Sequence, residues 1–334
     1  MKKILVIGGS GYIGTTLVED LFKQNYEVIN IDFEIYPDQK NGVNRNKNAN
    51  KNFISLDFRD TKEVSKYLKN IDSVVILGGL VGEYITKKYL ALSQSINIDG
   101  LVNLIDTLDQ FENIKKVIFI STCSNYGITD NTVLVNEDHE LKPISPYATA
   151  KVFIENYLFS KKNTKYSPTI LRFATAFGYS PRMRFDLTLN HFCYSMFREK
   201  KIELFDADTW RPYCHVKDFS SLIIKVINAK NELTNRQIFN VGSDENNYTK
   251  KGIAELVKKF LPETKIIFKK ESSDKRDYRV SFKKVNNILG FKPDHSVQYG
   301  IKEVLGILHH PNSRYLNENS LTIRGNFNIL DHVK

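Results

Sequence analysis

Tyr147 and Lys151 are the two residues of this sequence best suited to acid–base chemistry. They stand four residues apart in a stretch of helical character, so both side chains are expected on one face of a helix. An ammonium group beside a phenol stabilises the phenolate and lowers the pKa of the phenol from about 10. The phenol could then act as a general base near neutral pH. The alternative interpretation of this spacing is an ordinary pair on a surface helix.

A cluster of hydroxyl groups precedes this pair and favours the chemical interpretation. The stretch 116–121 has the apolar character of a strand, and Thr122 follows it directly, five residues before Gly127. Ligands of open α/β sheets bind at the carboxyl ends of the strands. Thr122 is therefore expected at the edge of a sheet where a ligand would bind.

The amino-terminal strand and helix are joined by a run of glycines. The apolar run 4–7 enters Gly8, Gly11 and Gly14, and a helical pattern follows from Tyr12 to Lys23. Such a spacing permits a tight turn, a close approach of backbone to a ligand, and packing of helix on strand. The amides at the helix start, including those of Tyr12 and Ile13, can bind a pyrophosphate. A tight turn without a ligand is the alternative.

Asp32 indicates which dinucleotide would be bound. It ends a second expected strand, 18 residues beyond Gly14, and no arginine follows it. A carboxylate there can bind both ribose hydroxyls of adenosine and would repel a 2′-phosphate, which favours NAD over NADP. An ordinary turn aspartate is the alternative.

A second candidate cofactor contact is the end of the later strand at 72–77, where Leu77 is followed by Gly78 and Gly79. Small residues there let the backbone pass close to a cofactor. A plain strand-to-helix turn is the alternative.

Strand and helix patterns alternate along the first half of the chain, which predicts an α/β fold with a parallel sheet covered on both faces. We expect an NAD-binding domain at 1–175, and a smaller mixed α/β lobe that binds substrate at 176–334, with the strand near 237–243 returning to the main sheet. The expected strands are 26–32, 53–57, 72–77, 116–121, 168–173, 202–205, 237–241 and 265–268. The expected helices are 12–23, one ending near 111, 146–161, 186–198, 218–229 and 250–260. The stretch 41–52, rich in Asn and Lys, is expected to be an exposed loop.

Composition excludes several classes of protein. The net charge is +10, but the lysines are scattered among acids and form no basic stripe with interleaved aromatic residues. We therefore expect no nucleic-acid partner. A phosphorylated small molecule would account for the positive charge equally well. No apolar run approaches the roughly 18 residues of a membrane span. The three cysteines form no Cys-x-x-Cys pair, which predicts reduced thiols, no metal site and a cytoplasmic protein.

With these motifs together, the chain resembles the extended short-chain dehydrogenases/reductases, the superfamily of NAD-dependent nucleotide-sugar epimerases, dehydratases and reductases. The resemblance covers nearly the whole length and implies a Rossmann-type, doubly wound parallel sheet. It assigns Thr122 as the catalytic hydroxyl, Tyr147 as the general base and Lys151 as the residue that tunes the base. The cofactor contacts that it implies or that the loops suggest are Gly8, Gly11, Tyr12, Ile13, Gly14, Asp32, Asp57, Phe58, Leu77, Gly78, Gly79, Asn97, Tyr147 and Lys151. The substrate contacts that it implies are Arg211, Asn190 and Arg276, on the side of a sugar-nucleotide diphosphate. Arg182 and Arg184 stand unusually close together and are expected to line the sugar or phosphate pocket, with pairing to surface acids as the alternative.

Two departures from the family pattern narrow the reaction. The 4,6-dehydratases carry an Asp-Glu pair directly after the catalytic threonine, where this chain has Cys123 and Ser124. The epimerase types that use a cysteine place it two residues after the hydroxyl, so Cys123 is interpreted as a packing residue. Hydride transfer at carbon 4 of the sugar remains, as a 4-epimerase or a 4-dehydrogenase.

The segments 180–187 and 274–281 resemble a subgroup from bacterial surface-polysaccharide clusters. That subgroup includes GDP-heptose 4-dehydrogenases and proteins similar to UDP-glucose 4-epimerase. A second hypothesis, from another functional class, is a sensor or scaffold protein that binds NAD without turnover. By analogy with the family, a homodimer is expected through the helix at 93–111 and the helix that carries Tyr147.

Overall fold

The architecture follows from short apolar strands that are buried on both faces. The computed structural model describes residues 1–36, 52–270, 274–311, 313, 315 and 325–330. In β1 (Lys3–Ile7), Ile4 and Val6 pack into one apolar core while Leu5 and Ile7 pack into another. Side chains alternate across a strand, so a continuous apolar run requires helices on both sides of the sheet.

Seven parallel strands form the main sheet, in the order β10-β6-β5-β4-β1-β2-β3. The chain builds outward from β1 in one direction and then restarts with β4 on its other side. The point between β1 and β4 is therefore the switch point at which such sheets bind ligands. The remaining bounds are β2 (Glu27–Asp32), β3 (Phe53–Ser55), β4 (Ser73–Ile76), β5 (Lys116–Thr122), β6 (Ser167–Phe173) and β10 (Gln237–Val241).

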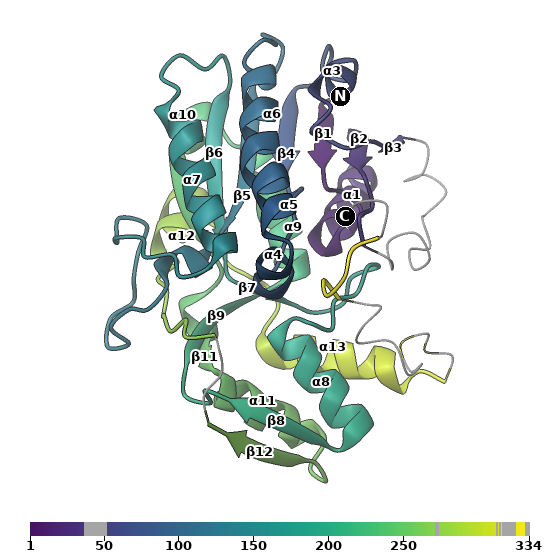
Figure 1. Cartoon of the computed structure of the whole chain (residues 1–334), viewed down its shortest axis with the longest axis vertical. Coiled ribbons are helices and arrows are strands. Elements are labelled where there is room, and N and C mark those ends of the chain that lie inside the picture. The colour runs from purple at the N-terminus through teal and green to yellow at the C-terminus, as the bar shows by residue number, and fades with distance from the viewer. Residues whose placement is uncertain (37–51, 271–273, 312, 314, 316–324, 331–334) are drawn as a thin grey trace.

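Helices cover both faces of this sheet, as the sequence predicted (Figure 1). One face carries α1, α9 and α12, and the other carries α3, α6 and α7. We call the sheet with these helices the Rossmann layer. Its helical segments are α1 (Tyr12–Lys23), α3 (Thr61–Ser65), α4 (Glu83–Lys88), α5 (Leu90–Gln94), the π-helix η1 (Ser95–Gly100), α6 (Leu101–Leu108), the 3₁₀ turn η2 (Cys123–Tyr126), α7 (Pro146–Ser160), α9 (Val216–Asn228), α10 (Asn231–Thr234) and α12 (Lys283–Leu289).

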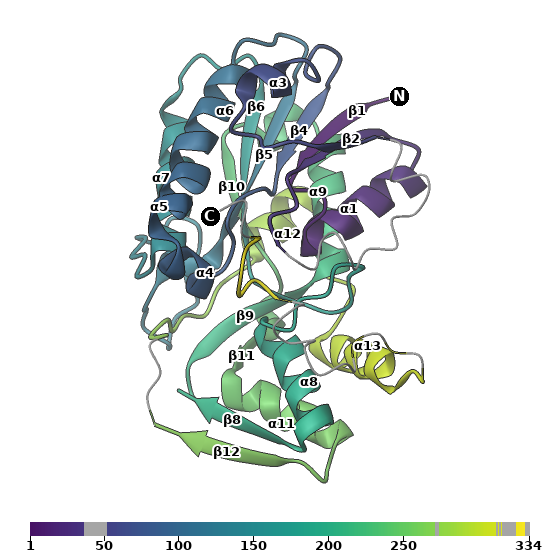
Figure 2. The same ribbon diagram turned by 45° about the vertical axis from the view of Figure 1, so that its right-hand side comes forward.

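A smaller second lobe lies below the Rossmann layer (Figures 1 and 2). Its apolar core joins three helices with two small sheets, one of order β11-β9-β7 and one of β12-β8. The lobe consists of β7 (Thr175–Phe177), α8 (Thr188–Glu199), β8 (Lys201–Phe205), β9 (Trp210–His215), the 3₁₀ turn η3 (Asp244–Asn246), β11 (Asn247–Thr249), α11 (Lys250–Phe260), β12 (Lys265–Lys269) and α13 (Val297–His309).

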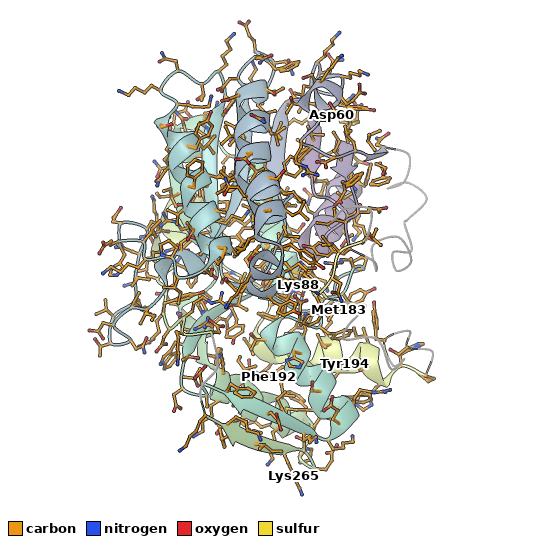
Figure 3. The ribbon with its side chains drawn as sticks, in the orientation of Figure 1. Asp60, Lys88, Met183, Phe192, Tyr194 and Lys265 are labelled. Carbon is orange, nitrogen blue, oxygen red and sulfur yellow. The ribbon has the colours of Figure 1, made fainter. Side chains whose placement is uncertain are left out.

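The chain passes between the two parts repeatedly after residue 175. It returns from β9 to α9 and β10, leaves for β11, α11 and β12, returns for α12, and leaves again for α13. Residues 325–330 come back to the Rossmann layer, where Ile329 packs with Tyr36, Leu80 and Ile85. In Figure 3, Asp60 lies at the far end of the Rossmann layer and Lys265 at the far end of the second lobe. Lys88 and Met183 lie near the junction in the same view.

Several elements differ from the sequence-based expectation. The long helix expected to reach residue 111 is divided into α5, η1 and α6, and it ends at Leu108. The strands β7, β9 and β11 and the helices α12 and α13 were not predicted. The loop expected at 41–52 lies, apart from Asn52, outside the described residues. None of the helices in the described part of the chain is long and apolar enough to cross a membrane.

Candidate active site

A cavity of about 440 Å³ opens at the carboxyl ends of the strands and extends to the second lobe. It brings together almost all of the residues that the sequence singled out. The predicted residues in its wall are Gly8, Gly11, Tyr12, Ile13, Gly14, Asp32, Asp57, Phe58, Leu77, Gly78, Gly79, Thr122, Tyr147, Lys151, Arg182, Arg184, Arg211 and Arg276. Asn97 and Asn190 are the two predicted site residues that do not line it.

The glycine loop is built for close backbone contact. Gly8 has φ +85°, and a Cβ atom there would lie 2.5 Å from the amide nitrogen of Gly78. A Cβ atom at Gly14 would lie 2.4 Å from the carbonyl oxygen of Gly8, so only glycine lets α1 start this close to β1. Gly11 is the N-cap of α1 and, among the described residues, no side chain caps it. The first-turn amides therefore remain for a ligand that carries anionic oxygens.

Asp32 ends β2 beside this loop, as the sequence predicted. Its carboxylate accepts hydrogen bonds from the amides of Ser10 at 2.9 Å and Glu34 at 2.7 Å, which fix its orientation at the cavity wall. Asp57 is held in a similar way, by a two-pronged ion pair with Arg59 at 2.6 to 3.1 Å. Both carboxylates thus have defined positions at the end of the cavity that the glycine loop forms.

Asn97 supports this end of the cavity from behind. It lies in the π-helical turn η1, and its side-chain amide forms hydrogen bonds with both the N–H and the C=O of Leu80, at 2.8 and 2.9 Å. A π-turn is a feature often found at functional sites. Asn97 therefore fixes the loop that follows Gly79, and a direct contact with the cofactor stays a prediction.

Tyr147 and Lys151 lie one turn apart on α7, which begins at Pro146 and is capped by Ser145. Lys151 Nζ lies 5.9 Å from the centre of the Tyr147 ring and donates a hydrogen bond to the carbonyl oxygen of Ile120 at 2.7 Å. Burial lowers the pKa of Lys151 to about 8, although the Glu155 carboxylate opposes this shift. A lysine with that pKa can exchange a proton near neutral pH.

The pKa of Tyr147 differs from the sequence-based expectation. Burial raises it above its ordinary value, and the nearby Glu83 carboxylate raises it further, while Arg184 and Arg276 lower it. The protein's own side chains therefore keep this phenol protonated at neutral pH. A lowered pKa would need additional positive charge in the cavity.

Thr122 ends β5 and faces the same cavity. Its hydroxyl accepts a hydrogen bond from the amide of Ser124 at 3.1 Å, so the turn η2 fixes the position of the oxygen. Cys123 points away into the core, where its thiol contacts the carbonyl oxygen of Arg172 at 3.2 Å and burial raises its pKa. These contacts fit a packing residue and not an acid–base catalyst.

A buried ion pair holds α7 against the sheet behind Tyr147 and Lys151. Arg172 donates to both carboxylate oxygens of Glu155 at 2.7 to 3.2 Å, and Ser121 and Asn125 donate to the same carboxylate. Because each charge is paired and hydrogen-bonded, the burial is tolerated. The network fixes the helix one turn beyond Lys151.

Arginines gather at the end of the cavity formed by the second lobe. Arg184 donates to both oxygens of Asp186 at 3.0 and 2.6 Å, and Arg182 lies 4.7 Å from the centre of the Tyr36 ring. Arg211 pairs with Asp274 at 3.2 Å. With Arg276 and Lys250, five cationic side chains face the three carboxylates of Glu83, Asp186 and Asp274 in this part of the wall. The surplus of positive charge suits a ligand with two negative charges.

Other cavity residues were not predicted from the sequence. Asn326 and Phe327 come from the segment that folds back onto the Rossmann layer, and Asn326 accepts a hydrogen bond from Arg182 at 2.8 Å. Glu83 follows the small residues 78–82, which could have indicated it. Asn190, by contrast, is fully buried, and its amide contacts the backbone of Gly178 and Arg184 and the hydroxyl of Tyr12 at 3.0 to 3.2 Å.

Comparison with known proteins agrees with this geometry. Residues 4–242, more than half of the chain, match the model of the NAD dependent epimerase/dehydratase family. The chain belongs to this family. NAD is thus its cofactor, and the residues of the glycine loop and Asp32 fit such a dinucleotide.

Similar members of the family carry names from sugar-nucleotide chemistry. A putative UDP-glucose 4-epimerase of Methanocaldococcus jannaschii is 25% identical, over 92% of this chain and 99% of its own. The UDP-glucose 4-epimerase of Lactobacillus helveticus is 27% identical, over 88% and 92%. The UDP-glucuronic acid 4-epimerase of Bacillus cereus, solved with UDP-glucuronic acid and NAD, is 25% identical, with a TM-score of 0.78 over 91% of this chain and 98% of that one.

Proposed function

We propose that this family member oxidises a nucleoside-diphosphate sugar at carbon 4 and returns the hydride to the opposite face, as a 4-epimerase. The observation that carries the proposal is the wall of one cavity. It holds Thr122, Tyr147 and Lys151 between the dinucleotide loop at one end and the arginines at the other. Relatives named as 4-epimerases support the same reaction. The subgroup resemblance of segments 180–187 and 274–281 favours a role in bacterial surface-polysaccharide synthesis.

The side chains act on the proton of the 4-hydroxyl. NAD, when bound, accepts the hydride and contributes a positive charge that favours the phenolate. Tyr147 takes the hydroxyl proton, and Thr122 hydrogen-bonds the same oxygen and orients it. Lys151, whose burial lowers its pKa to about 8, can take up and release a proton near neutral pH, and its hydrogen bond to the carbonyl oxygen of Ile120 holds the amine in place. The arginines bind the diphosphate and leave the sugar between them and Tyr147.

The test is turnover on a panel of UDP-, GDP-, dTDP- and CDP-sugars, with NMR to read the configuration at carbon 4 and absorbance to follow NADH. An epimerase gives the 4-epimer without NADH accumulation, whereas a 4-dehydrogenase gives a 4-keto sugar with an equal amount of NADH. Tyr147→Phe should lower kcat by about 100- to 10,000-fold. Tyr157→Phe is the matched control, because Tyr157 lies on the same helix and its hydroxyl contacts Asp106 at 2.5 Å, outside the cavity.

Full turnover by Tyr147→Phe would contradict the mechanism. A purified protein that holds NAD by mass spectrometry but converts no sugar nucleotide would instead favour the sensor or scaffold alternative. The two results are distinguishable, because the first requires an active wild type.

We further propose a cytoplasmic homodimer that pairs through the face formed by α5 and α7. Large apolar side chains lie open there, with Leu90 58%, Ile144 48% and Phe153 46% exposed. A hollow in this face is lined by Leu90 and Ile144, together with Ser93 and Pro146. Grouped apolar exposure of this kind marks a surface that another protein covers. The three cysteines are free and buried, which suits a reducing compartment.

A further inference from the structure

A closed cycle of three hydrogen bonds joins the first turn of α1 to the second lobe. The hydroxyl of Tyr12 donates to the carbonyl oxygen of Gly178 at 2.6 Å. The amide nitrogen of Gly178 donates to Oδ1 of Asn190 at 3.0 Å, and Nδ2 of Asn190 donates back to the Tyr12 hydroxyl at 3.2 Å. Tyr12 is 4% exposed and Asn190 is fully buried. Because the cycle is shielded from solvent, the loss of one bond leaves a buried polar group without its partner.

Asn190 is used fully as a donor within this arrangement. Its second amide hydrogen goes to the carbonyl oxygen of Arg184 at 3.0 Å, so both of its N–H groups are bound by the protein. Its side chain also does not line the cavity. These contacts indicate that Asn190 holds the segment 178–184 in place, in contrast to the direct substrate contact that the family resemblance implied.

Ser180 ties the same segment to α1 at a second point. Its buried hydroxyl donates to the carbonyl oxygen of Tyr12 at 2.6 Å and lies 2.9 Å from the hydroxyl of Thr15. Gly178 has φ +101°, and a Cβ atom there would collide with the ring of His215. Only glycine therefore lets the backbone pass between α1 and β9, where the cycle can form.

These bonds connect the cofactor end of the cavity with its arginine-rich end. Tyr12 opens α1, the helix whose first-turn amides are expected to bind the pyrophosphate of NAD. The segment that Tyr12 holds carries Arg182 and Arg184, which line the other end of the cavity. Met183, between them, lies near the junction of the two parts in Figure 3. A loosened segment would therefore displace both arginines relative to the cofactor loop.

The position of Arg184 also affects the proposed general base. Burial raises the pKa of Tyr147, and Glu83 and Tyr36 raise it further. Arg184 and Arg276 lower it, so a displaced Arg184 would leave the phenol harder to ionise. Both substrate binding and proton transfer thus depend on where this segment lies.

We propose that Tyr12 and Asn190 are positioning residues, which fix Arg182 and Arg184 in the cavity wall relative to the cofactor loop. They act through the backbone of the segment between Gly178 and Arg184. The inference rests on the proposed function. Since one hydrogen-bonded cycle contains both residues, a break at either residue has the same consequence, and a second break adds little.

The experiment measures steady-state kinetics on the UDP-, GDP-, dTDP- or CDP-sugar that the wild type converts best. Tyr12→Phe and Asn190→Ala should each raise KM about 10-fold, as expected for the loss of a buried hydrogen bond. The double variant should be little worse than either single variant. The affinity for NAD should stay nearly unchanged, because Gly14 packs the start of α1 on Gly8 independently of the second lobe.

The pH profile separates positioning from a merely structural role. In both single variants the rising limb of kcat should move to higher pH, because less positive charge favours the phenolate of Tyr147. Tyr12→Phe keeps the aromatic ring and carries the test if Asn190→Ala does not fold. Tyr166→Phe is the matched control, since it removes the hydroxyl of another buried tyrosine, directly before β6 and outside the cavity. This variant should change neither KM nor the profile.

Three results would overturn the inference. These are an unchanged KM in the single variants, an unchanged pH profile, and losses that add in the double variant. A wild type that converts no sugar nucleotide would instead contradict the proposed function.

Discussion

Replacement of Lys151 by methionine should remove activity and yet stabilise the folded protein at neutral pH. The ammonium of Lys151 is buried, with an exposure of 5%, and its one hydrogen bond among the described residues goes to the carbonyl oxygen of Ile120. Methionine has a similar length and no charge. The substitution therefore removes a desolvated cation and costs one hydrogen bond.

The magnitude follows from the pKa of Lys151, which burial lowers from 10.5 to about 8. Below pH 8 the lysine is protonated in both the folded and the unfolded chain, so the full cost of burying the charge is present. Between pH 8 and 10.5 the unfolded chain binds a proton that the folded protein has released, and stability rises with pH. At 1.36 kcal/mol per pKa unit, the wild type should gain about 2 to 3 kcal/mol from this group between pH 7 and pH 10.

The assay is denaturant unfolding of the wild type and of Lys151→Met at both pH values, with the cofactor removed from both proteins. The quantity to compare is the difference between their free energies of unfolding, because ionisations that both proteins share cancel in it. The free energy of unfolding of the variant minus that of the wild type should be larger at pH 7 than at pH 10 by about 2 to 3 kcal/mol. The lost hydrogen bond shifts both values equally. Lys162→Met, at an exposed lysine just beyond α7, is the control and should show no such pH dependence.

A difference in unfolding free energy that is the same at pH 7 and pH 10 would refute this reasoning. Lys151 would then titrate alike in the folded and unfolded chain, and burial could not have lowered its pKa. The proposed proton exchange by Lys151 near neutral pH would lose its basis as well. An unchanged kcat in Lys151→Met would separately contradict its role in the mechanism.

Three further predictions concern the two ends of the cavity and the outer surface. Asp32→Ser should weaken NAD binding by about 10-fold or more and narrow the preference for NAD over NADP, since the carboxylate expected to receive the ribose hydroxyls is lost. Equal effects on both dinucleotides in a binding titration would contradict this. Asn326→Ala should raise KM for the sugar nucleotide by about 10-fold, because the hydrogen bond between Asn326 and Arg182 is lost. The kcat and the affinity for NAD should stay nearly unchanged, and an altered NAD affinity would argue against this prediction. Phe153→Glu should halve the mass measured in solution by light scattering without unfolding the chain, because it places a charge in the proposed dimer interface. A wild type that is already monomeric would contradict the proposed dimer.

Much of the main sheet and the cofactor end of the site could be predicted, because their signals are local. The glycine loop, the strand before it and Asp32 lie within one short stretch, and alternating apolar runs define the strands around them. The shared helix face of Tyr147 and Lys151 could likewise be predicted, since helical spacing alone places these residues on one face. Local geometry therefore carried the prediction of which residues meet.

The second lobe was harder to predict for physical reasons that differ between elements. In β9, Pro212 interrupts an otherwise strand-like run, and a proline within such a run argues against a strand. The apolar residues of α13 (Val297, Ile301, Val304, Leu305 and Leu308) do follow helical spacing, so this helix carried a signal that was not recognised.

The arginine-rich end of the cavity depends on contacts between distant parts of the chain. Glu83 meets Arg276 across 193 residues, and Asn326 meets Arg182 across 144. No spacing in the sequence encodes such pairs. The pKa of Tyr147 shows the same limit, because its direction depends on burial and on Glu83 and not on the neighbouring lysine alone.

The repeated passage of the chain between the Rossmann layer and the second lobe restricts how this enzyme family can acquire new substrates. A single crossover between two related genes exchanges everything on one side of a point. Any such point beyond β7 would combine part of one parent's second lobe with the rest from the other parent. Apolar cores assembled from two parents would have to repack at the same time. Substitutions at individual wall positions avoid this cost, so new sugar specificities are expected to arise by point mutation and not by exchange of whole lobes.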